Sequence, residues 1–255
     1  MAWNPDQYLK FAAPRLRPAI DLLARIDSPS PVNVYDLGCG AGNVTRVLAE
    51  RWPNANLVGI DDSGAMLDQA AKVLPRVRWI NQSIAEWNPV DLADVIYSNA
   101  ALHWLPEHGL LLPKLAHALA PGGILAVQMP RNFMAPSHTL IAETVLSGAW
   151  RAKLQSLIAP PPVAEPSFYF SLLAPLAREL DIWETEYLQV LSGTDPVKEW
   201  VKGTWLKQFL DKLDNSESIA FEADYAARLR DAYPQQPDGT TLFPFRRLFI
   251  VMRRA

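Results

Sequence analysis

The sequence predicts an α/β protein with a parallel sheet and helices on both faces. The prediction rests on the alternation of strand-like and helix-like segments and on the topology that such an alternation produces. Short apolar runs rich in β-branched residues alternate with helix-like segments of about 10–15 residues through the first half of the 255-residue chain. Connections of this kind are right-handed crossovers between strands of one sheet, so the strands that they join lie parallel and the helices cover both faces.

The expected strands follow one another at regular intervals. The first covers NVYDLGC (33–39), and the helix after it ends at RWPNAN, where Pro53 stops it. A second strand over 56–61 leads into a helix that begins at Ser63, a typical N-cap residue. The next strands are expected at 77–83, 93–100 and 123–130, with a helix within 110–123.

The alternation stops after Pro130. Residues 131–180 are expected to form a helical insertion, interrupted by prolines at 159–163, and 181–191 to form the next strand. A second helical insertion of two helices is expected at 195–233, before a last strand over 240–254. The expected order is therefore an N-terminal helical segment (1–30), a core (31–130), an insertion (131–180) and a C-terminal part (181–255) with the last two strands.

Composition narrows the possible functions. The 24 basic and 27 acidic residues nearly cancel, without any block of like charge, so neither nucleic acid nor an anionic membrane is an expected partner. The first 30 residues lack a signal-peptide pattern and no apolar stretch reaches membrane-spanning length, which predicts a cytoplasmic protein. One cysteine and four histidines, without metal-ligand spacing, predict neither an internal disulfide nor a bound metal.

Three glycines, Gly38, Gly40 and Gly42, alternate with other residues in VYDLGCGAG. A glycine-rich turn between a parallel strand and a helix lies where open α/β sheets bind ligands, although a purely structural turn is the alternative. Asn43 occupies the position of the third glycine in a dinucleotide fingerprint, which disfavours NAD or FAD. Asp61 ends the second strand, where its carboxylate could accept hydrogen bonds from both ribose hydroxyls or act as a turn or cap residue.

The motifs VYDLGCGAG and GIDDS resemble those of the class I S-adenosylmethionine-dependent methyltransferases, over about residues 30–130. The resemblance implies a Rossmann-like, seven-stranded, mostly parallel sheet with one antiparallel strand. It implies S-adenosylmethionine as methyl donor and S-adenosylhomocysteine as product. It also implies that the turn at Gly38 passes under the methionine part, that Asp61 holds the ribose, and that many relatives carry aspartate where this chain has Ser83. The implied cofactor-binding residues are Asp36, Gly38, Cys39, Gly40, Gly42, Asp61, Asp62, Ser63, Met66, Ser83, Ile84, Asn99 and Ala100.

Further stretches at 3–26, 98–108, 201–213 and 242–254 are similar to the trans-aconitate 2-methyltransferases, bacterial enzymes that esterify one carboxylate of trans-aconitate. This likeness runs nearly end to end and implies direct in-line methyl transfer to a small polycarboxylic acid. A carboxylate is already ionised at neutral pH, so no general base and no catalytic residue are expected.

A polycarboxylate substrate needs a dry pocket with arginines to match its other carboxylates. Arg131 directly follows the strand expected at 123–130. If the last strand is antiparallel, as in the methyltransferase fold, Arg246 and Arg247 lie at the same edge and point to opposite faces, and Arg246 is the favoured one. His103, Trp104 and Tyr8 are expected to line the pocket and the two insertions to form a helical lid. For each of these residues a surface or packing role is the alternative.

Two other functions stay open. A methyltransferase for another small molecule, such as a quinone precursor or an acyl-carrier-bound dicarboxylate, would not need Arg131 and Arg246. A non-catalytic module that binds S-adenosylmethionine as a sensor or scaffold would keep the glycine turn and Asp61 without turnover. Fold analogy alone does not choose among substrates.

Overall fold

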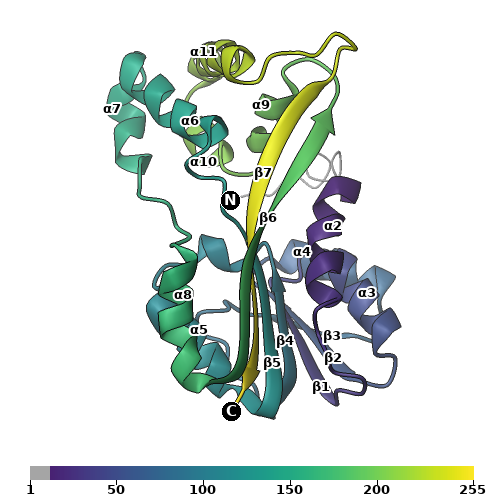
Figure 1. The fold of residues 1–255 in the computed structure, drawn as a ribbon. Helices are drawn as coiled ribbons and strands as arrows, with labels where there is room; N and C mark the ends of the chain where they lie inside the picture. The colour runs from purple at the N-terminus through teal and green to yellow at the C-terminus, as the bar shows by residue number, and fades with distance from the viewer. Residues whose placement is uncertain (1–11) are drawn as a thin grey trace. The chain divides into compact units, whose positions relative to one another are not determined.

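The computed structural model describes the backbone of residues 12–255 and the side chains of residues 16–255 (Figure 1). Within this part of the chain one seven-stranded sheet has the order β3-β2-β1-β4-β5-β7-β6. β1 to β5 pair in parallel, whereas β7 runs antiparallel to β5, which confirms the predicted sheet. The strands are β1 (Asn33–Leu37), β2 (Asn56–Asp61), β3 (Arg78–Asn81), β4 (Ala93–Asn99), β5 (Leu119–Pro130), β6 (Ala177–Leu191) and β7 (Thr241–Arg254).

The chain folds as two compact units, and each has its own core. The first, called the sheet unit, comprises residues 16–130, 162–185 and 247–255. The second, called the helical unit, comprises residues 12–15, 131–161 and 186–246.

Helices cover both faces of the sheet unit, as the alternation of strands and helices predicts. α2 (Ala12–Leu23), α3 (Asn43–Arg51) and α4 (Gly64–Val73) lie on one face, and α5 (His108–His117) and α8 (Pro166–Leu173) lie on the other (Figure 1). The central strands are therefore buried from both sides, and Val95, Ile96 and Tyr97 of β4 are completely inaccessible to solvent. A rigid layered sheet of this kind holds its strand ends in fixed positions.

The helical unit is built from α6 (Pro136–Ser147), α7 (Arg151–Leu154), α9 (Pro196–Lys202), α10 (Lys207–Leu210) and α11 (Asn215–Ala232). Its core gathers large side chains, among them Trp150, Trp200, Phe221, Tyr225 and Phe243. α11 begins with a capping box, in which the Asp214 carboxylate accepts the Glu217 N–H and the Glu217 carboxylate accepts the Asp214 N–H. The second insertion thus contains three helices instead of the two that were expected.

The bounds of α5, β5 and β6 differ from those expected from the sequence. The helix expected within 110–123 ends at His117, and β5 begins at Leu119 because Leu119 already pairs with Ala93. β6 likewise begins at Ala177, four residues earlier than expected. α8, inside the expected insertion 131–180, belongs to the sheet unit.

A buried hydrogen-bond chain explains the place of α8. His108 Nε2 donates to the Leu102 carbonyl over 2.9 Å, so His108 Nδ1 accepts a hydrogen bond from the Tyr169 hydroxyl at 2.8 Å. The Tyr169 oxygen in turn accepts the Ala164 N–H at 3.1 Å. α8 is therefore tied to α5 by fully satisfied polar groups as well as by apolar packing.

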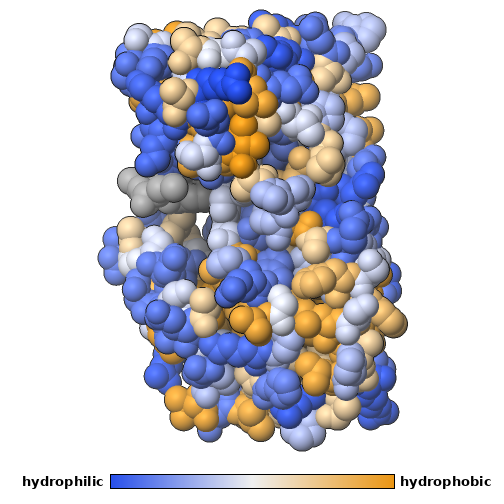
Figure 2. All heavy atoms as spheres, turned by 90° about the vertical axis from the view of Figure 1, so that its left-hand side faces the viewer, coloured by the Kyte–Doolittle hydropathy of each residue, from blue (hydrophilic) through white to orange (hydrophobic). Residues whose placement is uncertain are grey.

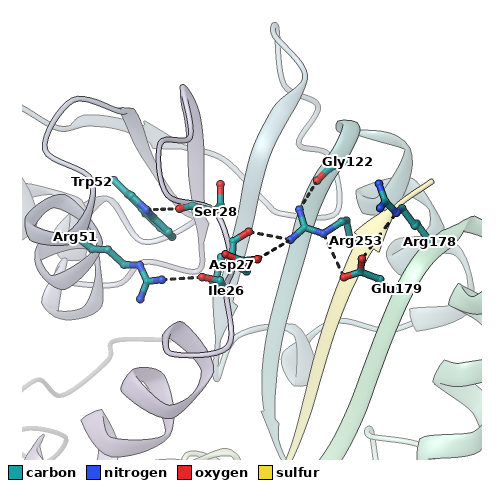
Figure 3. Close-up of polar contacts among 9 residues, drawn as sticks. All are labelled: Ile26, Asp27, Ser28, Arg51, Trp52, Gly122, Arg178, Glu179 and Arg253. Atoms are coloured by element: carbon teal, nitrogen blue, oxygen red, sulfur yellow. Dashed lines mark hydrogen bonds and ion pairs between the residues drawn. The ribbon is translucent and has the colours of Figure 1, made fainter.

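Polar contacts also hold the segment that precedes β1 (Figure 3). The Arg253 side chain donates to the carbonyls of Asp27 (2.8 Å) and Gly122 (3.0 Å), and the Trp52 indole donates to the Ser28 carbonyl (2.9 Å). These contacts occupy the edge where the parallel strands begin. The opposite edge, where the strands end, carries the glycine turn.

On the face shown in Figure 2, hydrophilic residues predominate and apolar residues form scattered groups between them. No helix within residues 12–255 has the length and the apolar character needed to cross a bilayer.

Candidate active site

The turn after β1 needs its glycines for two different reasons. Gly38, Gly40 and Gly42 all have positive φ, at 76°, 53° and 80°. A Cβ on Gly38 would overlap the Cβ of Ala101, and one on Gly42 would lie 3.1 Å from the Trp79 ring. A Cβ on Gly40 would meet no atom of the described chain within 4 Å. Gly38 and Gly42 are thus required by packing, whereas Gly40 borders open space.

Asp61, at the end of β2, is hydrogen-bonded to this turn. Its Oδ2 accepts the Gly40 N–H at 2.9 Å, and its Oδ1 accepts the Ser63 N–H at 2.9 Å. Burial raises the pKa of Asp61, and the two backbone hydrogen bonds oppose that shift. Ser63 is the N-cap of α4, as expected, but its side chain makes no capping hydrogen bond. The neighbouring Asp62 is exposed.

A second carboxyl group, Asp36, is buried beneath the turn. It is 2% exposed, and the Thr45 hydroxyl donates to its Oδ2 over 2.6 Å. Burial raises the pKa of Asp36 to about 7, helped by the negative charge of Asp61 and opposed by the Thr45 hydrogen bond. Burial also raises the pKa of the Cys39 thiol, so this cysteine is not a nucleophile at neutral pH.

The residues assigned to the adenine side lie at the ends of β2 and β3. Ile84 is buried, and its Cδ1 lies 3.6 Å from the position that a Cβ on Gly38 would take. The Ser83 hydroxyl accepts the Ala85 N–H at 3.3 Å, and Met66 is half-buried in the first turn of α4. The structure therefore brings Ile84 against the glycine turn, and the contacts of Met66 and Ser83 with adenine stay predictions.

The end of β4 carries backbone strain. Ala100 has a φ of 52°, a conformation that residues other than glycine seldom adopt. Its N–H donates to the Gln128 carbonyl at 2.9 Å, and the Asn99 Cα pairs with that of Gln128 in the sheet. Strained residues of this kind persist where the surrounding structure fixes them, often at functional sites.

The residues predicted to contact the acid have different environments. His103 is buried in the 3₁₀ helix Leu102–Trp104, with its ring 4.7 Å from that of Trp104, which is 49% exposed. The Arg131 N–H donates to the Arg246 carbonyl at 2.9 Å. The Arg246 side chain is half exposed, and its Nη2 lies 3.8 Å from Glu186 Oε2.

His103 and Trp104 belong to the sheet unit, and Arg131 and Arg246 to the helical unit. Tyr8 lies outside the described residues. The contacts of all five residues with the acid substrate stay predictions.

Sequence reasoning missed Gln128 at the end of the sheet and named Arg247 only as the less favoured of two arginines. Both residues belong to the sheet unit. Gln128, in β5, is completely buried, and Arg247, in β7, is 5% exposed. The Arg247 Nη1 donates to Gln128 Oε1 at 3.2 Å. The sequence does contain a sign of this contact, because Gln128 interrupts the apolar run GILAVQMP. A polar residue in a strand that is buried on both faces needs a polar partner.

Comparison with known proteins assigns the chain to a family. Residues 34–123 match the family model described as a methyltransferase domain. A trans-aconitate 2-methyltransferase of Azoarcus sp. (strain BH72) is 47% identical over 252 residues, which are 99% of this chain and 99% of that protein. This chain belongs to the trans-aconitate 2-methyltransferase family. Another member of this family, from Methylobacterium nodulans, is 46% identical over 99% of this chain and 98% of its own.

Solved structures share the fold of this trans-aconitate 2-methyltransferase family member at low sequence identity. The YcgJ protein of Bacillus subtilis has a TM-score of 0.59 and 14% identity, with 93% of this chain and 98% of that one covered. A phosphoethanolamine N-methyltransferase of Haemonchus contortus, solved with S-adenosylhomocysteine, has a TM-score of 0.56 and 14% identity. The match covers 94% of this chain but only 53% of the nematode chain.

The described residues hold no group of three or more His, Cys, Asp or Glu side chains placed to bind a metal ion. Toward the strand ends, Asp61 contacts the Gly40 N–H and Asp36 contacts Thr45, while Gln128 lies beside Asn99 in the sheet and contacts Arg247.

Proposed function

We propose that this chain transfers the methyl group of S-adenosylmethionine to a carboxylate oxygen of trans-aconitate. The observation that carries the proposal is the end-to-end likeness, at 47% identity, to a protein named for this reaction. A small polycarboxylate as partner molecule and the cytoplasm as location belong to the same proposal, and both rest on the sequence. A methyltransferase fold alone does not identify the substrate.

The residues present fit S-adenosylmethionine. Gly40 leaves the backbone of the turn accessible, and each Asp61 oxygen holds one backbone N–H and keeps a lone pair for a ribose hydroxyl. The buried carboxyl group of Asp36, with a pKa of about 7, titrates close to neutral pH, and a positively charged ligand above it would favour its ionised form. When bound, S-adenosylmethionine supplies a methyl group on a positively charged sulfur.

The chain has to orient the acid and exclude water, and it need not move a proton. A carboxyl group with a pKa of about 4 is ionised at neutral pH. Its oxygen forms the new bond to the methyl carbon as the carbon–sulfur bond breaks, and both electrons of that bond stay on sulfur. Opposite charges are neutralised, so a dry site favours the reaction. Alignment of the two reactants can contribute on the order of 7–11 kcal/mol.

The test is a direct assay of ester formation. The purified protein is incubated with S-adenosylmethionine labelled in the methyl group and with trans-aconitate, cis-aconitate, citrate or fumarate in parallel. We expect a labelled ester from trans-aconitate, no ester with Asp61→Ala, and normal turnover with Asp68→Ala, which removes an exposed carboxylate of α4. S-adenosylhomocysteine binding without ester from any acid would instead identify a non-catalytic binding module.

A further inference from the structure

The helical unit contains a short chain of hydrogen-bonded polar side chains at the start of α6. Asn132 and Ser137 are buried, and His138, in the first turn of α6, is half-buried. Asn132 Nδ2 donates to Ser137 Oγ over 3.2 Å, and Ser137 Oγ lies 3.0 Å from His138 Nδ1. All three residues belong to the same compact unit, so this chain of contacts depends on that unit alone.

The directions of these hydrogen bonds follow from the first residue of the chain. Asn132 Oδ1 accepts the Arg246 N–H at 3.2 Å, so the amide oxygen is engaged and Nδ2 is the end that donates to Ser137. The Ser137 hydroxyl then has one proton to donate, and His138 Nδ1 is the acceptor that the structure places within reach. With Nδ1 as acceptor, a neutral imidazole carries its proton on Nε2.

The surroundings of His138 keep its imidazole neutral. Burial lowers the pKa of His138 to about 4, so the ring is uncharged at neutral pH. Two aromatic rings pack against it, with the centroid of Phe133 at 5.1 Å and that of Trp205 at 6.3 Å from the imidazole centroid. His138 is therefore a hydrogen-bond donor in a fixed orientation, and it carries no charge of its own.

The Nε2–H of His138 is the donor at the end of the chain. Within residues 16–255 the structure gives it no hydrogen-bond acceptor. His138 Nε2 is also not one of the fully buried unpartnered atoms in this part of the chain, so it is open to solvent or to a ligand. A neutral donor that is held by a hydrogen-bond chain and flanked by aromatic rings is typical of ligand pockets, where a few placed polar groups fix orientation.

We infer that His138 Nε2 donates a hydrogen bond to a carboxylate of the acid substrate. The two arginines predicted to contact the acid are tied to the same chain, because the Arg246 N–H donates to Asn132 and the Arg131 N–H donates to the Arg246 carbonyl. The first turn of a helix also favours negative charge. An arginine attracts any carboxylate, whereas a neutral donor fixes where one carboxylate lies. This inference rests on the proposed function, because it concerns the same acid.

Two substitutions of His138 separate this role from simple packing. Phenylalanine keeps an aromatic ring beside Phe133 and Trp205 but has no donor, whereas glutamine gives up the ring and keeps an N–H donor. If His138 only fills space between the rings, His138→Phe should leave the KM for trans-aconitate unchanged. If His138 binds a carboxylate, His138→Phe should raise the KM about 10- to 100-fold, and His138→Gln should raise it less.

The experiment measures three quantities on the full chain: the KM and kcat for trans-aconitate, the Kd for S-adenosylhomocysteine by calorimetry, and the melting temperature. For His138→Phe we expect the Kd to stay within about 3-fold of wild type, because the lost hydrogen bond concerns the acid. For Ser137→Ala, which frees the imidazole to take either tautomer, we expect a KM about 3-fold higher. His117→Phe, which replaces an exposed histidine of α5, serves as control and should change none of the three.

A measurement on the wild-type protein locates the proton directly. NMR of protein with isotope-labelled histidine distinguishes the Nε2–H from the Nδ1–H tautomer, and His138→Gln identifies the signal. We expect His138 to be neutral and protonated on Nε2 at pH 7. We also expect its Nε2 signal to shift when trans-aconitate is added to protein saturated with S-adenosylhomocysteine.

Several outcomes would overturn the inference. They are an unchanged KM in His138→Phe, a Kd for S-adenosylhomocysteine that weakens as much as the KM rises, a larger rise in KM for His138→Gln than for His138→Phe, or an Nδ1–H tautomer. Should His138→Phe fail to fold, the wild-type NMR decides, because a signal that does not respond to bound acid excludes the contact. The proposed function fails in a different way, when the wild-type protein binds S-adenosylhomocysteine but forms no ester with any acid.

Discussion

Replacement of Asp36 by asparagine should remove one source of pH dependence from the stability of the ligand-free protein. Burial raises the pKa of the Asp36 carboxyl group from 3.8 to about 7 in the folded chain. The folded state therefore holds this proton more tightly than the unfolded state does. The stability that the neutral carboxyl group provides is complete below pH 3.8 and is lost as the pH rises to about 7. Asparagine has the same shape, can still accept the Thr45 hydrogen bond, and does not titrate.

The pKa gives the size of the effect. Each pH unit between the unfolded and folded pKa changes the free energy of unfolding by about 1.4 kcal/mol for one group. From pH 5.5 to pH 7 the wild-type protein should therefore lose about 2 kcal/mol relative to Asp36→Asn, and nothing further above about pH 7.5. Over the whole window from pH 3.8 to 7 the loss amounts to about 4 kcal/mol.

Urea unfolding of both proteins at pH 5.5, 7.0 and 8.0, without ligand, measures this difference. Glu50→Gln serves as the control, because it removes an exposed carboxylate of α3 and should follow the wild-type curve. The reasoning would be refuted if the difference in unfolding free energy between wild type and Asp36→Asn stayed constant from pH 5.5 to 8.0.

Other substitutions test the remaining parts of the site. Asp61→Ala should abolish calorimetric binding of S-adenosylhomocysteine, whereas Arg131→Ala should raise the KM for the acid and leave that binding nearly intact; equal losses in both variants would contradict the role of Arg131. Gly38→Ala should lower the melting temperature and prevent cofactor binding, because its methyl group would overlap Ala101 at a positive φ, and normal binding would show that the turn can relax. Tyr169→Phe should destabilise the sheet unit by about 1–3 kcal/mol in urea unfolding, since it leaves a buried histidine nitrogen without its hydrogen bond, and an unchanged midpoint would mean that the bond contributes little.

Local patterns were enough to predict the sheet and the turn. The alternation of apolar strands and helices repeats over more than 90 residues, and Gly38 and Gly42 are positions where the backbone itself demands glycine. Asp61 could also be placed, because it ends a strand at the same edge of a parallel sheet. Such features depend on neighbours in sequence or on strand order, and both can be inferred from one chain.

Features that depend on packing between distant segments were not predictable. α8 joins the sheet unit through a hydrogen bond between His108 and Tyr169, residues that are 61 positions apart. The alternation of side chains placed Arg246 and Arg247 on opposite faces but could not say which face is buried, since that depends on Gln128 in another strand. β5 begins earlier than expected for a similar reason, because Leu119 pairs with Ala93 of another strand.

The hydrogen bond from the Gly40 N–H to Asp61 joins the glycine turn to the carboxylate that is proposed to hold the ribose. This carboxylate is oriented by the same loop that would support the amino-acid portion of the ligand, so binding would require little ordering of these two groups. A nucleoside without the amino-acid chain would therefore find the Asp61 carboxylate already oriented for the ribose. Its affinity would measure the ribose and adenine contacts alone.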